Sequence, residues 1–183
     1  MNKFSLLKLA SVLAAVLLLP AAQAANMSKV DYKGAKARIS ADYKTDKTAC
    51  AALAANAKDI CVQEANAKEK VAYAELEYAY TGKAADQNKV LVAKADTAYA
   101  VAKERCDDKA GNDKDVCVKE AKAVQIKALA DAKMGKEIRA AKKDASQDKR
   151  DADYKVALEK CDALAGDPKA ACVAAAKAKF GKS

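Results

Sequence analysis

Residues 106–117 read CDDKAGNDKDVC, two cysteines with ten residues between them. The stretches CAALAANAKDIC (residues 50–61) and CDALAGDPKAAC (residues 161–172) have the same spacing, and the three stretches begin 56 and 55 residues apart. Such a regular recurrence indicates three similar units. Among the pairings that six cysteines allow, it predicts one local disulfide in each unit. The predicted bonds are Cys50–Cys61, Cys106–Cys117 and Cys161–Cys172.

The residues between each pair of cysteines predict a tight turn between two helices. Gly111 and Gly166 lie where the end of a helix needs a left-handed residue, and Ala55 occupies the same position in the first unit. The next helix is expected to start directly afterwards, with Pro168 at the first helical position of the third unit. The predicted N-cap residues are Asn56, Asn112 and Asp167.

The composition favours helix along the whole chain, because alanine, lysine and glutamate are all strong helix formers. The prediction is an all-α protein of about six helices, arranged as three disulfide-stapled hairpins. Thr81–Lys83 and Met134–Lys136 are the candidate breaks between units, which gives units of about 28–80, 84–134 and 136–183. One interior glycine costs only about 1 kcal/mol, so the fourth and fifth helices could also be continuous. Two architectures remain open, an antiparallel bundle and an elongated helical array.

The N-terminus has the pattern of a secretory signal peptide. Lys3 and Lys8 precede an apolar run over residues 9–19, and the small residues Ala22 and Ala24 lie where a signal peptidase reads the chain. We predict cleavage after Ala24, which leaves residues 25–183 as a single helical repeat domain. No second long apolar run follows, so no integral membrane span is expected after cleavage. The predicted location is the bacterial periplasm or the medium, where paired cysteines persist as disulfides.

The residue types argue against an enzyme. The chain has no histidine, which excludes nucleophile–histidine pairs and histidine metal sites, and it has no glycine-rich phosphate loop. Cysteines that bind a metal usually lie two to four residues apart, whereas these are separated by ten. We therefore expect no catalytic residue, cofactor or metal site.

The net positive charge of the chain is a candidate basis for binding an anionic partner. Without residues 1–24 the chain has 32 basic and 25 acidic residues, a net charge of +7. The signs are interspersed, which is typical of a solvated helix surface, but an attraction to envelope polyanions is the alternative. Nucleic acid is not favoured, since no nucleic-acid-binding motif is present. The residues after Asp167 lack acidic side chains, and the candidate polyanion contacts there are Lys169, Lys177, Lys179 and Lys182.

A tyrosine precedes the first cysteine of each unit by seven residues, and a valine follows the second. We expect Tyr43, Tyr99 and Tyr154 to pack beside the disulfides, with ligand stacking as the alternative. The pattern Tyr-x6-Cys-x10-Cys-Val, together with the ending AKAKFGK (residues 176–182), resembles a group of small exported proteins of β-proteobacteria loosely labelled TolA-like cell-envelope proteins. The resemblance covers the chain after the signal peptide. It implies an exported helical envelope protein and no particular activity.

Two classes of function follow from these observations. The first is a non-enzymatic periplasmic protein that acts through its surface as a scaffold, spacer or stress-related interaction module. Its partner would be an envelope protein or an anionic envelope polymer. The second is a thiol-based function, either metal or redox buffering, which requires cysteines that are reduced or exchangeable in the cell.

Overall fold

The computed structural model describes residues 27–182, and these residues form helices joined by short turns, with no strand among them. This confirms the predicted all-α class with three disulfide-stapled hairpins. The predicted signal peptide lies outside the described residues. A short 3₁₀ turn follows the first helix at Cys50–Ala52. The five helices are α1 (Lys29–Ala49), α2 (Ala55–Thr81), α3 (Ala84–Cys106), α4 (Gly111–Asp162) and α5 (Gly166–Phe180).

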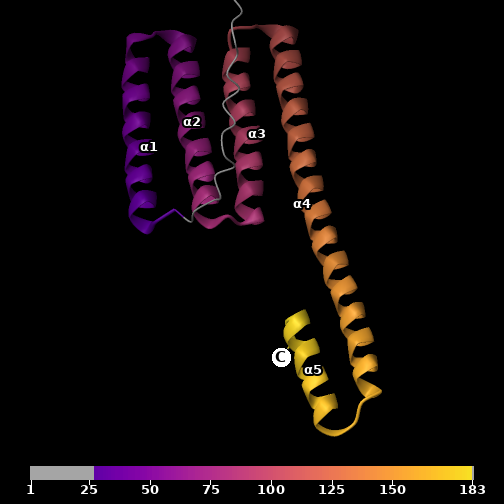
Figure 1. Ribbon diagram of the computed structural model, residues 1–183. Helices are drawn as coiled ribbons and strands as arrows, with labels where there is room; N and C mark the ends of the chain where they lie inside the picture. The colour runs from indigo at the N-terminus through magenta and orange to yellow at the C-terminus, as the bar shows by residue number, and fades with distance from the viewer. Residues whose placement is uncertain (1–26, 183) are drawn as a thin grey trace, which may run out of the picture.

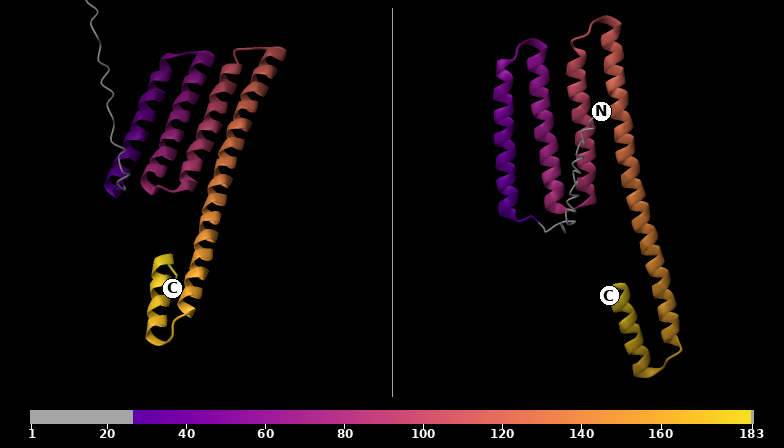
Figure 2. Two further views of the ribbon diagram at one scale, coloured as in Figure 1. Left: turned by 45° about the vertical axis from the view of Figure 1, so that its right-hand side comes forward. Right: turned by 45° about the horizontal axis from the view of Figure 1, so that its top comes forward.

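The helices form a single layer, in which each helix lies antiparallel to the one before it (Figure 1). Within residues 27–182 every helix packs only on its neighbours in the sequence. The two views of Figure 2 show α1 to α4 side by side and α5 folded back along the far end of α4. Of the two predicted architectures, the elongated array is therefore the one that forms.

The fourth and fifth predicted helices are one continuous helix, which is one of the two alternatives that the sequence left open, so residues 27–182 have five helices, close to the predicted number of about six. Gly82 ends α2 in a left-handed conformation (φ 62°), and its N–H donates to the carbonyl of Tyr78. Gly135, in contrast, lies inside the 52-residue α4. One interior glycine costs about 1 kcal/mol relative to alanine, and its neighbours Met134 and Lys136 are good helix formers. The helix therefore continues through this position.

The turn between each pair of cysteines has the left-handed residue that the sequence predicted. The φ angles are 48° at Ala55, 54° at Gly111 and 62° at Gly166. The predicted N-caps were wrong, because the extended residue that precedes each helix is Ala54, Ala110 or Ala165. The residues expected to cap lie already inside the helices, and Pro168 is the third residue of α5 rather than the first.

The buried seams between the helices are thin. Leu76 of α2 and Val90 of α3 are the largest buried aliphatic side chains, and most other buried positions hold alanine or cysteine. A buried methyl or methylene group contributes only about 0.8 kcal/mol, so seams of alanine stabilise less than seams of leucine. Covalent bonds between neighbouring helices are a physically reasonable supplement to such a core.

Candidate functional site

The six cysteines form the three predicted disulfides, one at each tight turn. The Cα atoms of the paired cysteines are 5.6 to 5.7 Å apart, within the range that disulfides require. Cys50, Cys106 and Cys161 are almost completely buried. Within residues 27–182 no cysteine is free and no group of three or more potential metal-ligating residues comes together. The disulfides thus act as staples between adjacent helices.

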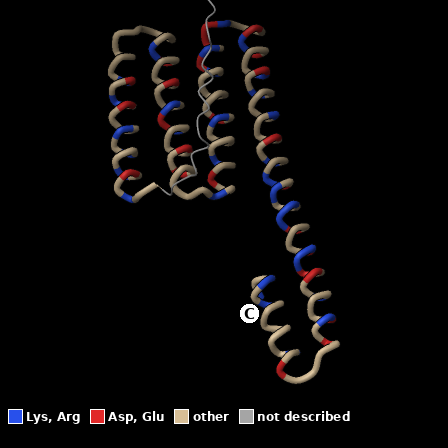
Figure 3. The backbone as a smooth tube through the Cα atoms, viewed as in Figure 1, with Lys and Arg blue, Asp and Glu red and all other residues tan. Residues whose placement is uncertain are grey.

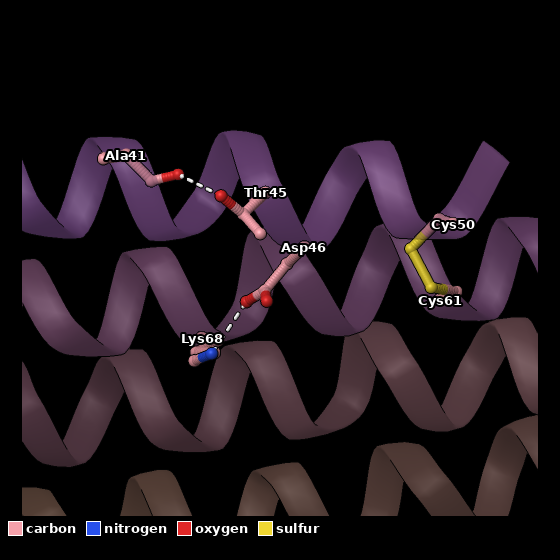
Figure 4. Close-up of polar contacts among 6 residues, drawn as sticks. All are labelled: Ala41, Thr45, Asp46, Cys50, Cys61 and Lys68. Carbon is pink, nitrogen blue, oxygen red and sulfur yellow. Dashed lines mark hydrogen bonds and ion pairs between the residues drawn. A yellow bond between two sulfur atoms is a disulfide. The ribbon is translucent and has the colours of Figure 1, made fainter.

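The first staple has ordinary structural surroundings (Figure 4). Lys68 of α2 forms a 2.7 Å ion pair with Asp46 of α1, and this hydrogen bond raises the pKa of the Lys68 ammonium. The hydroxyl of Thr45 donates to the carbonyl of Ala41 one turn earlier in α1. The ion pair links α1 to α2, and the Thr45 hydroxyl bonds to the backbone of its own helix.

The tyrosines before the first cysteines link the two helices of each hairpin. The Tyr43 hydroxyl donates to Oδ1 of Asn66 at 2.8 Å. The ring of Tyr99 lies under the Lys122 ammonium at 4.9 Å, and the ring centroid of Tyr154 is 5.9 Å from that of Phe180. All three side chains are half-buried. This geometry agrees with the predicted packing role.

The turn between α2 and α3 contains a buried carboxylate. Asp86 is 5% exposed, accepts a hydrogen bond from the Thr81 hydroxyl at 2.5 Å and forms a 2.8 Å ion pair with Lys89. The hydrogen bond from Lys89, followed by that from Thr81, lowers the pKa of Asp86. Asp86 thereby connects the end of α2 to the first turn of α3. Both partners of Asp86 lie within five residues of it, so they fix the local turn.

The four C-terminal lysines predicted to bind polyanions do not form one patch of free charge. Lys169 pairs with Asp162 at 3.0 Å, and Lys182 pairs with Asp151 at 2.8 Å. Lys177 and Lys179 are exposed, and the Lys179 ammonium lies 5.3 Å from the centroid of the Phe180 ring. Two of the four charges are thus offset by carboxylates of α4.

An apolar groove of about 630 Å³ runs between α3 and α4. Leu91 and Tyr99 of α3 and Val124 of α4 line it, and alanines from both helices form most of its floor. Leu91 is 42% exposed and Val124 65% exposed, so the groove opens to solvent. Sequence reasoning did not single out this groove, because its lining residues are scattered over two helices whose relative position the chain pattern leaves open.

A second feature that sequence reasoning missed is the middle of α4. We define the α4 midsegment as residues 133–150; it has seven basic and three acidic residues. Figure 3 shows the blue bands of Lys and Arg concentrated along this part of the helix. A search for stretches free of acids passes over the midsegment, whereas a count of net charge in a moving window would have found it.

The fold and the staples define the class of this molecule as a single-layer array of disulfide-stapled helical hairpins. Its three disulfides fit an extracellular or periplasmic protein. In the part of the chain that the structure covers, residues 27–182, we find no helix with the length and hydrophobicity to cross a bilayer. Comparisons with protein-family models, curated proteins and solved structures find no match to this chain. The resemblance to exported β-proteobacterial proteins therefore stays a prediction.

Proposed function

We propose that this protein is a non-enzymatic scaffold or interaction module of the bacterial periplasm, with a structural or stress-related role in the cell envelope. The observation that carries the proposal is the open apolar groove between α3 and α4. Exposed apolar surface that is concentrated in one place marks interaction sites more often than it occurs by chance on a soluble surface. The partner is an envelope protein that inserts apolar side chains into this groove.

The shape of the groove favours a helical partner. Alanines of α3 and α4 line the two sides of the groove, so the backbone of a bound helix can approach closely. Amphipathic helices bind such grooves through apolar side chains spaced three and four residues apart. Leu91 and Val124 stand at the rim, where a partner would cover them. The ion pair between Lys94 and Glu75, at 2.6 Å, holds one groove-lining residue in place from the neighbouring helix α2.

Photo-crosslinking in living cells tests the proposal. A photoreactive amino acid at Val124 samples the groove, and the same amino acid at Val156, also an exposed valine of α4 (54%), samples a surface outside it. We expect discrete crosslinked adducts from position 124 that are missing from position 156. The substitution Leu91→Gln should reduce the adducts without loss of helix content. Absence of adducts at 124, or the same adducts at both positions, would contradict the proposal.

The second candidate function is thiol-based metal or redox buffering, which the six cysteines favour. It requires that disulfides open in the cell, and each first cysteine of a pair is nearly inaccessible to solvent. Rapid alkylation of intact cells, followed by mass spectrometry of peptides under non-reducing conditions, separates the two candidates. Three fully oxidised local pairs would support the scaffold, whereas free or metal-protected thiols would support buffering.

A further inference from the structure

Most of the excess positive charge of residues 27–182 lies in the α4 midsegment. Residues 27–132 have 19 basic and 17 acidic side chains, and residues 151–182 have six basic and five acidic ones. The 18 residues between them have seven basic and three acidic side chains, so they contribute +4 of a net +7. The two ends of the molecule are close to neutral by comparison. The positive field of the protein is therefore centred on the midsegment.

The second half of the midsegment, residues 140–150, is also the part of α4 that other described helices leave uncovered. The antiparallel register set by Cys106–Cys117 places the first residue of α3, Ala84, opposite about residue 139. At the other end, Lys182 beyond α5 reaches only to Asp151. Helix α4 packs on α3 and α5 alone within residues 27–182. About 16 Å of helix between these two contacts is consequently open along the side where α3 and α5 pack.

The basic side chains are arranged on one side of the midsegment, and four of them, Lys142, Lys143, Lys149 and Arg150, lie in the open stretch. At 3.6 residues per turn they cover an arc of about 200°, and the three acids lie together beyond one edge of it. Arg139 and Lys143 continue the face by which α4 buries Ala132 against α3 and packs Tyr154 near α5. The members of the arc are Lys133, Lys136, Arg139, Lys142, Lys143, Lys149 and Arg150.

These charges are largely unpaired. Elsewhere in the array, some basic side chains form ion pairs across the seams between helices. Arg105 pairs with Glu64 across the seam between α2 and α3, and Lys68 pairs with Asp46 across that between α1 and α2. Within residues 27–182, the one ion pair of the midsegment joins Lys133 to Glu137 at 3.9 Å. Nη2 of Arg139 is buried and has no hydrogen-bond partner in the described chain.

The geometry points to the α4 midsegment as a binding site for a linear anionic polysaccharide. From Lys133 to Lys143 a positive charge recurs about every 5 Å along the helix, and Lys149 and Arg150 follow after about 9 Å, a series that a flexible chain of anionic groups can follow. This surface is distinct from the apolar groove, and its occupation does not depend on a partner there.

Other occupants fit the midsegment less well. Proteins that bind single-stranded nucleic acid add aromatic side chains for base stacking, and residues 133–150 contain none. A helix that lies in a membrane surface needs a substantial apolar face, and here the large apolar side chains are only Met134 and Ile138. A second copy of the chain would bring one excess of positive charge against another.

The test compares two triple variants that each remove one arginine and two lysines. R139Q/K142Q/K143Q acts on the midsegment, and K29Q/K33Q/R38Q removes the same charges from exposed positions of α1. The probe is a fluorescein-labelled heparin oligosaccharide, and its anisotropy is titrated with the whole disulfide-intact protein at several salt concentrations. We expect the midsegment variant to bind at least tenfold more weakly, with a smaller salt dependence, and the α1 variant to change affinity less than threefold.

Further variants and probes separate the possible failures. Equal weakening by both triple variants would mean binding by overall charge, and no heparin binding by the parent protein would remove the site; either result overturns the inference. So would a larger loss in K177Q/K179Q, which would move the contact to α5. Equal or tighter binding to single-stranded DNA or to anionic lipid vesicles would overturn the assignment to a polysaccharide. The groove variant Leu91→Gln should keep the heparin affinity of the parent protein. The heparin titration therefore tests the midsegment even if the groove proposal fails.

Discussion

At the scale of single residues, the three stapled turns differ in a way that affects stability. Within residues 27–182, Ala55 is the one residue other than glycine with a positive φ, at 48°. The equivalent residues of the other two turns are Gly111 and Gly166, and no atom lies within 4 Å of where a Cβ would be. Glycine adopts the left-handed backbone without a steric penalty. The first turn therefore holds a strained conformation that the other two avoid.

Replacement of this alanine by glycine should stabilise the protein. The left-handed conformation costs an alanine about 1–2 kcal/mol, whereas the added freedom of glycine in the unfolded chain costs about 0.5–1 kcal/mol. We expect Ala55→Gly to raise the free energy of unfolding by about 0.5–1 kcal/mol in urea denaturation with disulfides intact. The control Ala57→Gly, two residues into the helix, should lower it. A loss of stability in both variants would show that Ala55 is not strained.

The carboxylate of Asp86 should give the protein a stability that depends on pH. Its pKa in the folded state is lowered by the hydrogen bonds from Lys89 and Thr81. Its contribution is thus complete above the ordinary pKa of aspartate, about 4, and is lost as the pH falls below it.

The variant Asp86→Asn tests this dependence. It should unfold at a lower temperature than the parent at pH 7, and the difference should shrink below about pH 4. The control Asp153→Asn, which removes an exposed carboxylate of α4, should change the melting temperature little at either pH. A difference between Asp86→Asn and the parent that stays constant with pH would show that the hydroxyl contact alone matters.

At the scale of secondary structure elements, the helices differ in how much their stability depends on the disulfides. Helix α5 has 15 residues and, among the described residues 27–182, packs only on α4, whereas α3 packs on both α2 and α4. Isolated helices of this length are marginal in water, so α5 relies on its covalent bond.

Removal of the third staple should therefore release α5. A local disulfide of this loop size contributes about 3 kcal/mol in the chain-entropy model. We expect C161S/C172S to lose protection from amide hydrogen exchange throughout α5, while the other helices remain protected. In C106S/C117S, we expect α3 and α4 to stay protected at reduced overall stability. Retained protection of α5 in the first variant would mean that packing suffices.

The continuity of α4 depends on the helix propensity around Gly135. The added Cβ of Gly135→Ala would meet only the Arg139 guanidinium, at 3.5 Å, an ordinary contact. We expect this variant to be more stable by about 0.5–1 kcal/mol. Gly135→Pro should instead lower the helix content measured by circular dichroism and destabilise the protein by about 3 kcal/mol. A Gly135→Pro variant as helical and as stable as the parent would indicate a break already present at this position.

At the scale of the whole molecule, the array should be elongated in solution. A compact domain of about this length has a radius of gyration of about 15 Å. A 52-residue helix is about 78 Å long, and a rod of that length alone has a radius of gyration of about 22 Å. We expect small-angle X-ray scattering to give a value above about 20 Å. Because an intact α4 alone exceeds it, a value near 15 Å would mean that α4 is broken and that the third hairpin folds back on the others.

Elongation also explains how two separate binding surfaces can exist on a small chain. A single layer leaves both faces of each inner helix in contact with solvent (Figure 1). The groove between α3 and α4 and the uncovered midsegment of α4 both result from this arrangement. In a closed bundle the same residues would be covered by other helices.

Local patterns were sufficient to predict much of the fold. The ten-residue spacing predicted the hairpins and their cysteine pairs, and Gly111 and Gly166 marked the left-handed turns, because these features depend on contacts between residues close in the sequence. The N-caps at Asn56, Asn112 and Asp167 were wrong for a local reason. The left-handed residue leads directly into the helix, so the next residue is already helical, and Asn56 instead donates to the carbonyl of Glu104 in α3.

The sequence by itself determined the all-α class, the staples and the excess of positive charge, since helix propensity, cysteine spacing and charge are properties of the chain. Only the tertiary structure decided that Gly135 leaves α4 unbroken while Gly82 ends α2 in a left-handed conformation, because a glycine accepts either backbone conformation. It also decided which charges are free. Lys169 and Lys182 meet carboxylates of α4, whereas Lys142 and Lys143 lie where no described helix reaches. Pairing between distant residues depends on helix register, which local preferences do not specify.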